Sequence, residues 1–195
     1  PERELRAGYA EVAKYGLLGD ARFFSWLEEN SSAVLALDTD AIIYAISKSC
    51  EVKARIVEAD EREAGKRALL NLGHTFAHAF EAEAGYNGSL LHGEAVAAGL
   101  GLAFDLSVDL GICAADHASR CKTHLQTVGL PSGQSDLATG NISAHRLIEH
   151  MRHDKKMRNG KIHFILVRAI GEAFVSGDVP SDKLKALLER DKNVV

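Results

Sequence analysis

Proline, the residue that most strongly interrupts a helix, occurs only at Pro1, Pro131 and Pro180 in this 195-residue chain. Between the first two prolines, apolar residues recur at helical spacing, and the pattern is broken mainly by glycine and Asn-Gly turns. Asp38 or Asp40 can cap one of the resulting helices. We therefore expect helices over residues 3–18, 21–29, 41–59, 62–84, 92–110, 114–128, 143–152 and 181–190.

The pattern changes near the C-terminal end of the chain. Residues 161–167 and 172–175 are short β-like runs joined by Ala169-Ile170-Gly171, which predicts a hairpin. The sequence contains neither a βαβ alternation nor a GxGxxG motif, so no cofactor-binding residues for a dinucleotide are expected in this chain. The predicted fold class is mainly α, a multi-helix domain over residues 1–195 with one small β-hairpin.

Composition narrows the function classes. The net charge is −4 and the basic residues are scattered, so neither nucleic-acid binding nor an anionic membrane surface is expected. No apolar run approaches the ~20 residues of a membrane helix. The three cysteines form no CxxC pair, which favours free thiols in a reducing cytoplasm. Of these, Cys50 is expected to be a small buried hydrophobe.

A polar stripe is the most informative feature of the chain. Its members are spaced four, four, three and four residues apart, which places them on one face of a continuous helix: Glu63, Arg67, Asn71, His74 and His78. A solvated helix face is the simpler interpretation. The residue types favour a site instead, as do Gly65 and Gly73, each of which costs ~1 kcal/mol in a helix unless something packs closely against it.

Several of the polar residues are candidate metal ligands. His74 and His78 are four residues apart and can point at one site, but the segment lacks the glutamate of HExxH metalloproteases. His92, at the start of a predicted helix, is a third candidate, although such a histidine is more often a cap or exposed. Glu11 is a fourth candidate, and the alternative for it is an ordinary surface ion pair with Lys14.

Six segments together resemble 3-dehydroquinate synthase over essentially the whole chain and in the same order. They are RAGYAEVAKYG (residues 6–16), SCEVK (49–53), DERE (60–63), RALLNLGHTFAH (67–78), LHGEAV (91–96) and DKK (154–156), followed by the hairpin. The most specific part is the pair of motifs NLGHTxxH and LHGE.

The resemblance implies an enzyme of two domains with the active site between them. One is an N-terminal NAD-binding α/β domain, which is absent from this chain, and the other is the helical domain found here. The family is a cytoplasmic, commonly homodimeric lyase of the shikimate pathway, which makes aromatic amino acids. It converts 3-deoxy-D-arabino-heptulosonate 7-phosphate into 3-dehydroquinate and phosphate through transient oxidation by NAD, elimination, re-reduction, ring opening and aldol closure. Alone, the helical domain is expected to be inactive.

The resemblance also implies roles for individual residues. The metal ligands would be Glu11, His74 and His92, holding Zn²⁺ or sometimes Co²⁺ and leaving positions open for two substrate hydroxyls. Lys14 would lie beside those hydroxyls as a catalytic residue.

The remaining matched residues would bind the two ends of the sugar-phosphate substrate. Lys53, Arg67 and Asn71 would hold its carboxylate. His78 would be a catalytic and substrate-binding residue near the leaving phosphate. Lys155 or Lys156 would contact that phosphate, with Lys155 preferred. Glu63 would be a catalytic-site carboxylate that orients Arg67 or Lys53. The other histidines are expected at the surface: His117, His124, His145, His150, His153 and His163.

Three alternatives remain open. Another sugar-phosphate cyclase, making 2-deoxy-scyllo-inosose or a valienone-type ring, would share the fold, metal and NAD but not the carboxylate-binding residues. An iron- or zinc-dependent alcohol dehydrogenase would lack those residues as well. A non-catalytic helical interaction module would need no coherent set of metal ligands, and would tolerate charge reversal at Arg67.

Overall fold

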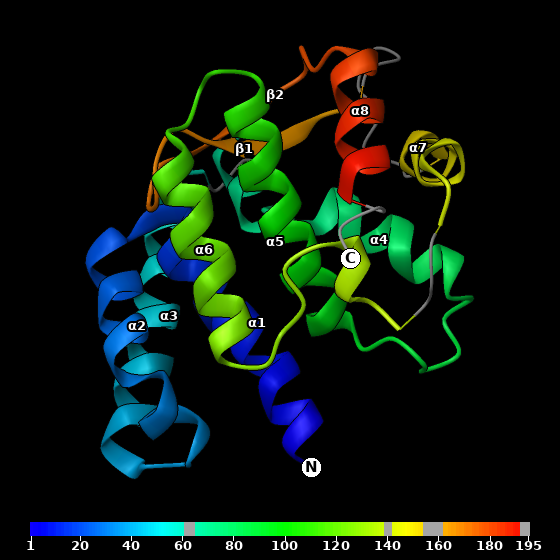
Figure 1. Ribbon diagram of the computed structural model, residues 1–195. Helices are drawn as coiled ribbons and strands as arrows, with labels where there is room; N and C mark the ends of the chain where they lie inside the picture. The colour runs from blue at the N-terminus through cyan, green and yellow to red at the C-terminus, as the bar shows by residue number, and fades with distance from the viewer. Residues whose placement is uncertain (61–64, 139–141, 154–161, 192–195) are drawn as a thin grey trace.

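The computed structural model describes residues 1–60, 65–138, 142–153 and 162–191 (Figure 1). Within these residues the expected fold class, a mainly α domain with one small antiparallel hairpin, is confirmed. The α-helices are α1 (Glu2–Gly19), α2 (Ala21–Leu35), α3 (Thr39–Glu58), α4 (His74–Glu83), α5 (His92–Asp109), α6 (Ala115–Thr127), α7 (Ala144–His153) and α8 (Ser181–Asp191). Short 3-10 helices are η1 (Lys66–Asn71) and η2 (Gln134–Asp136), and the strands are β1 (Phe164–Val167) and β2 (Ala173–Ser176).

Aspartate caps start two of the helices in the N-terminal part of the chain. Asp20 accepts a hydrogen bond from the Phe23 amide and Asp38 accepts one from the Ala41 amide, each over 3.0 Å. Each cap satisfies a backbone donor that the first turn of a helix leaves without a partner. The helix that begins after Asp20 continues to Leu35, past the expected end at residue 29, because Leu27, Ser31 and Val34 continue its buried face.

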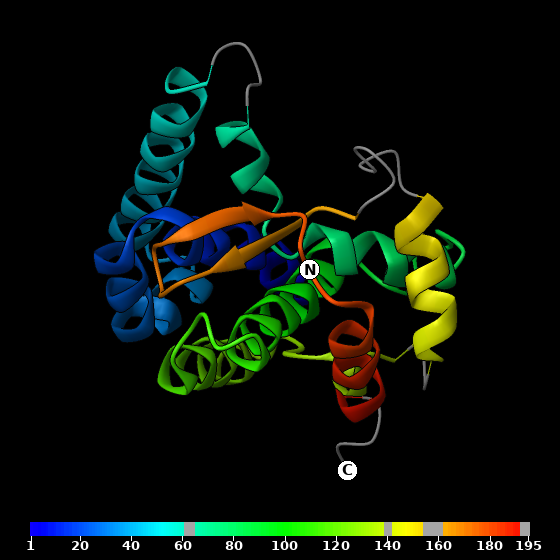
Figure 2. The same ribbon diagram turned by 90° about the horizontal axis from the view of Figure 1, so that it is seen from above.

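Helix α5 is the centre of the domain. It contacts α1, α4, α6, α8 and β1, and the figures show it running through the middle of the molecule (Figures 1 and 2). Its middle, residues 95–104, is apolar on all sides, as expected for a helix that is surrounded by other elements. Two glycines allow main chains to touch it closely: a Cβ at Gly93 would collide with the carbonyl oxygen of Ala7, and one at Gly99 would collide with that of Gly73.

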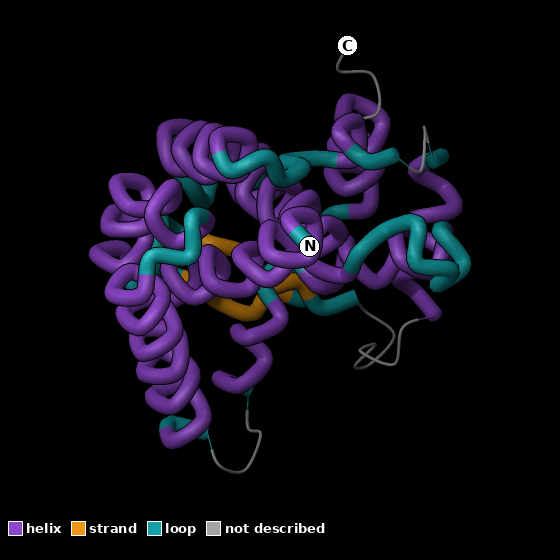
Figure 3. The backbone as a smooth tube through the Cα atoms, turned by 90° about the horizontal axis from the view of Figure 1, so that it is seen from below, coloured by secondary structure: helices purple, strands orange, loops and turns teal. Residues whose placement is uncertain are grey.

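The hairpin lies among the helices (Figure 3). Strand β1 is buried along its whole length, whereas β2 is mostly half-buried. Antiparallel pairing sets Phe164 opposite Ser176 and Val167 opposite Ala173. The Val167 amide also donates to Ser107 Oγ on α5 over 3.0 Å, so the hairpin is attached to the central helix by a buried hydrogen bond.

The expected continuous helix over residues 62–84 is wrong. Within the described residues, η1 ends at Asn71 and α4 begins at His74. Between them Leu72 is extended and Gly73 adopts a left-handed conformation with φ of 81°. Gly73 lies against the backbone of α5 at Val96 and Leu100, so the close packing expected at this glycine is confirmed. Because of this break, the polar residues do not form one helical stripe.

Three smaller expectations are also wrong. A Cβ at Gly65 would meet nothing within 4 Å, and a positive φ of 141° is the feature there that suits glycine. His124 is 4% exposed, and its Nε2 is hydrogen-bonded to Tyr9 Oη over 2.9 Å. Cys50 is exposed, because α3 turns it away from the core.

No helix in the described parts of the chain is both long and apolar enough to cross a membrane.

Candidate metal centre

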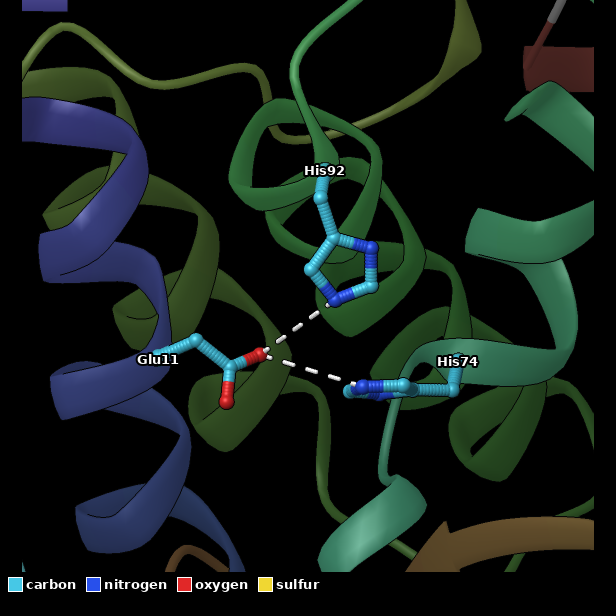
Figure 4. Close-up of side chains that lie close together, drawn as sticks. All are labelled: Glu11, His74 and His92. Carbon is cyan, nitrogen blue, oxygen red and sulfur yellow. Dashed lines mark ion pairs between the residues drawn. The ribbon is translucent and has the colours of Figure 1, made fainter. Parts of the chain in front are cut away.

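Three segments far apart in the sequence bring one carboxylate and two imidazoles together (Figure 4). Glu11 lies in the middle of α1, His74 is the first residue of α4, and His92 is the first residue of α5. One potential ligand atom from each lies within 4.8 Å of the other two. Since α1 and α4 both pack against α5, the central helix determines where the three side chains meet.

One oxygen of the Glu11 carboxylate faces both imidazoles. Its Oε1 lies 3.8 Å from His74 Nε2 and 4.0 Å from His92 Nε2, distances too long for hydrogen bonds. The same oxygen is buried and has no hydrogen-bond partner. Two ligands about 2.1 Å from one tetrahedral ion are about 3.4 Å apart, so small side-chain movements would suffice to bind an ion. The donor set therefore fits a divalent metal.

The state of His74 suits a metal ligand. Its Nδ1 lies 3.2 Å from the carbonyl oxygen of Leu72, which leaves Nε2 facing Glu11. Burial, followed by the positive charge of Lys14, lowers the pKa of His74 to about 4. A metal binds neutral imidazole, so the ring is in its binding form at neutral pH.

Lys14 is part of the same cluster. Its ammonium donates a hydrogen bond to Glu11 Oε2 over 2.7 Å, and the residue is only 3% exposed. Burial lowers the pKa of Lys14, the Glu11 carboxylate opposes that change, and the charge of Lys53 adds to it. The ion pair of the alternative interpretation is therefore present, but it is not a surface pair, because Lys14 is buried. Within the Glu11 carboxylate, Oε2 accepts the hydrogen bond from Lys14 and Oε1 faces the two histidines.

The other expected site residues lie at varying distances from this group. The His78 ring is 5.6 Å from the His74 ring, but His78 is not among the clustered ligand atoms found in the described residues. Lys53 is exposed on α3, close enough to influence Lys14. Arg67 and Asn71 lie on η1, which packs against α1 and α3. The expected site residues Glu63, Lys155 and Lys156 lie outside the described residues.

One residue of the cluster was missed by the sequence analysis. Glu81 Oε1 lies 3.0 Å from His92 Nδ1, on the far side of the imidazole from Glu11. The signal was present, because Glu81 follows His78 by three residues and continues the polar face of the same helix.

Two solved structures resemble the whole chain. A 2-epi-5-epi-valiolone synthase from Streptomyces hygroscopicus subsp. jinggangensis, with NAD⁺ and Zn²⁺ bound, has a TM-score of 0.84 at 25% identity and covers 97% of this chain and 51% of its own. A 2-deoxy-scyllo-inosose synthase complexed with carbaglucose-6-phosphate, NAD⁺ and Co²⁺ has a TM-score of 0.82 at 19% identity, covering 98% of this chain and 53% of its own. The fold is thus that of the helical half of the sugar-phosphate cyclases.

Sequence comparison gives the family within that class. Residues 8–157 match the family described as 3-dehydroquinate synthase C-terminal, and the chain belongs to this family. The 3-dehydroquinate synthase of Caulobacter vibrioides is 52% identical over 188 residues, which are 96% of this chain and 51% of that protein. That of Cereibacter sphaeroides is 53% identical over 189 residues, 97% of this chain and 51% of that protein. The chain therefore spans about half the length of the curated relatives it matches.

Proposed function

We propose that this chain is the metal- and substrate-binding half of a 3-dehydroquinate synthase. Its reaction would be conversion of 3-deoxy-D-arabino-heptulosonate 7-phosphate into 3-dehydroquinate and phosphate. The observation that carries the proposal is Glu11 Oε1, a buried carboxylate oxygen without a hydrogen-bond partner that faces the Nε2 atoms of His74 and His92. A buried oxygen of this kind is costly unless a cation completes its environment.

In this proposal Glu11, His74 and His92 hold a Zn²⁺ or Co²⁺ ion. When bound, the ion would act as a Lewis acid that lowers the pKa of the substrate hydroxyl to be oxidised. Three protein ligands leave positions open for substrate. Lys14, hydrogen-bonded to Glu11, would donate a second hydrogen bond to the substrate hydroxyls and oppose the negative charge that gathers there.

The substrate's two anionic ends require cationic partners on either side of this centre. Lys53 and Arg67 lie on α3 and η1, two elements in contact, and together with Asn71 they are suited to bind a carboxylate. We assign the phosphate end to His78, next to His74, and to Lys155 or Lys156. Glu63 is assigned to orienting Arg67 or Lys53. Holding a self-reacting substrate in one geometry is itself a large part of catalysis.

The proposed reaction also requires bound NAD. An NAD-binding domain N-terminal to the helical domain is needed for the redox steps. The chain matches about half the length of its relatives, which is compatible with such a second domain. A homodimer and a cytoplasmic location remain predictions.

The main competitor is another cyclase of the same fold. Carbaglucose-6-phosphate, present in one structural relative, carries no carboxylate. An enzyme for such a substrate has no need of Arg67 together with Lys53. The 52% identity to a 3-dehydroquinate synthase favours the carboxylated substrate.

A domain exchange tests the activity. The chain would replace the matching half of the Caulobacter vibrioides enzyme, and release of phosphate from the heptulosonate substrate would be measured. We expect turnover, and its loss by at least ~100-fold in Arg67→Glu, about 3 kcal/mol of lost transition-state binding. Arg22→Glu, on the exposed face of α2, is the matched control and should keep full activity. Arg67→Glu that turns over like Arg22→Glu would contradict the carboxylate assignment.

Metal content tests the site independently of turnover. The purified chain should bind near-stoichiometric Zn²⁺ or Co²⁺, and His74→Ala/His92→Ala should bind none. A second double variant, His145→Ala/His153→Ala, removes two exposed histidines of α7 and should bind as the parent does. Absence of metal from the parent chain after Zn²⁺ is supplied would overturn the assigned ligand set.

A further inference from the structure

We infer that Glu81 is a positioning residue for the candidate metal centre, fixing the tautomer and direction of the His92 imidazole. The effect of Glu81 on metal binding rests on the proposed function, whereas its effect on the tautomer and direction of His92 does not. Glu81 lies on α4, two helical turns beyond His74 and on the same face. Helix α4 would thus supply one metal ligand directly and hold a second ligand in place.

The contact is well defined on both sides of the ring. Glu81 Oε1 lies 3.0 Å from His92 Nδ1, and His92 Nε2 lies 4.0 Å from Glu11 Oε1. The Glu81 side chain is 16% exposed, whereas that of His92 is 48% exposed. A half-exposed imidazole at the first position of a helix has rotational freedom, and a mostly buried carboxylate can remove it.

The chemistry of the acceptor decides the tautomer. An ionised carboxylate can only accept a hydrogen bond, so it selects the imidazole that carries its proton on Nδ1. The Nε2 lone pair is then free and directed toward Glu11, where a metal would bind. A carboxylate behind a metal-binding histidine also raises the basicity of the ligand. His74 obtains the same orientation from the Leu72 carbonyl, which is backbone and cannot be removed by substitution.

The alternative is that Glu81 and His92 form only a structural ion pair between α4 and α5. Glu83 on the same helix offers a matched comparison. Its side chain is 14% exposed and pairs with Arg146 and His150 on α7, each over 3.0 Å, and it is not among the clustered ligand residues. A purely structural role predicts that Glu81→Gln and Glu83→Gln have similar effects on stability and neither affects His92.

The first test uses the metal-free chain and ¹⁵N NMR of its histidine side chains at about pH 8, where an ordinary histidine is neutral. We expect His92 to be the Nδ1-H tautomer in the parent, in Glu81→Gln, whose amide oxygen still accepts, and in Glu83→Gln. In Glu81→Ala we expect a mixture with the Nε2-H form. A parent with the proton on Nε2, or a Glu81→Ala variant with an unchanged tautomer, would overturn the inference.

The second test is Zn²⁺ affinity by competition with a chelator. Loss of such an orienting partner typically lowers metal affinity about 10- to 100-fold, which we expect for Glu81→Ala, with a smaller loss for Glu81→Gln and none for Glu83→Gln. The contrary result is that Glu81→Gln and Glu83→Gln lose equal Zn²⁺ affinity, in proportion to the drop in their unfolding midpoints. That result would show that Glu81 has only a structural role. If the parent bound no Zn²⁺, the proposed function would fail, and the tautomer measurement would still decide the role of Glu81.

Discussion

The ammonium of Lys14 donates a hydrogen bond to Glu11 over 2.7 Å, yet the two partners are buried very unequally, with side chains 4% and 35% exposed. The cost of losing one partner therefore depends on which one remains. A buried lysine without its carboxylate retains a charge that water cannot reach, whereas the glutamate without its lysine remains partly solvated.

We expect Glu11→Gln to destabilise the metal-free chain more than Lys14→Met does. The loss for Glu11→Gln should be about 1–3 kcal/mol of unfolding free energy. Lys14→Met should lose less, because Met fills the same space and the Glu11 side chain that remains is 35% exposed. Urea denaturation of both variants at neutral pH measures the difference. The opposite order would contradict the idea that the more deeply buried partner determines the loss.

The spacing between α1 and α5 should control metal binding. A Cβ at Gly93 would collide with the carbonyl oxygen of Ala7, one turn before Glu11, so Gly93→Ala must push the helices apart. We expect a stability loss of about 1–3 kcal/mol and weaker Zn²⁺ binding. Gly8→Ala is the control: it lies on α1 with open space around it and should stabilise by up to ~1 kcal/mol. Unchanged Zn²⁺ affinity in Gly93→Ala would argue against this dependence.

Acid should destabilise the fold through His124. Burial lowers the pKa of His124 to about 4, while an unfolded histidine titrates near pH 6.5. Between those values the unfolded chain binds more protons, so this contribution is complete above about pH 6.5 and disappears as the pH falls toward 4. Its full size is about 3 kcal/mol.

Thermal unfolding of the metal-free chain as a function of pH measures this effect. His124→Gln keeps an acceptor for Tyr9 but cannot titrate, so its stability should fall less between pH 6.5 and 4 than that of the parent. His145→Gln, at an exposed position of α7, should follow the parent curve. Parallel curves for all three proteins would exclude His124 as the cause.

The buried hydroxyl of Ser107 should contribute measurably to the attachment of the hairpin to α5. Ser107 Oγ accepts from the Val167 amide and donates to the Ala103 carbonyl, and the residue is fully buried. Ser107→Ala would leave the amide without this partner and should cost about 1–3 kcal/mol of unfolding free energy. Thr127→Ala removes an exposed hydroxyl bonded to a backbone carbonyl of its own helix and should change stability by less than about 0.5 kcal/mol. Equal stability of the two variants, measured in urea, would contradict the assigned role.

Much of the fold follows from local information. Asp38 begins its helix as a cap because its side chain reaches an amide three residues away, and that interaction needs no tertiary partner. The middle of α5, residues 95–104, is apolar on every side, which predicts an interior helix. The spacing of the β-like runs placed the hairpin. Local patterns did not reveal the break at Leu72–Gly73, because it arises from contact between Gly73 and a helix more than twenty residues further along the chain.

The sequence by itself determined the helical class, the hairpin and, through motifs typical of one family, the family and the three residues that the structure brings together. Only the tertiary structure decided that Lys14 and His124 are buried, that Cys50 is exposed, that one oxygen of Glu11 has no hydrogen-bond partner and that Glu81 lies behind His92. The physical reason is the distance along the chain over which each interaction acts. Capping and periodicity act within a few residues, whereas burial and the direction of a polar group depend on elements that meet only when distant helices pack against α5.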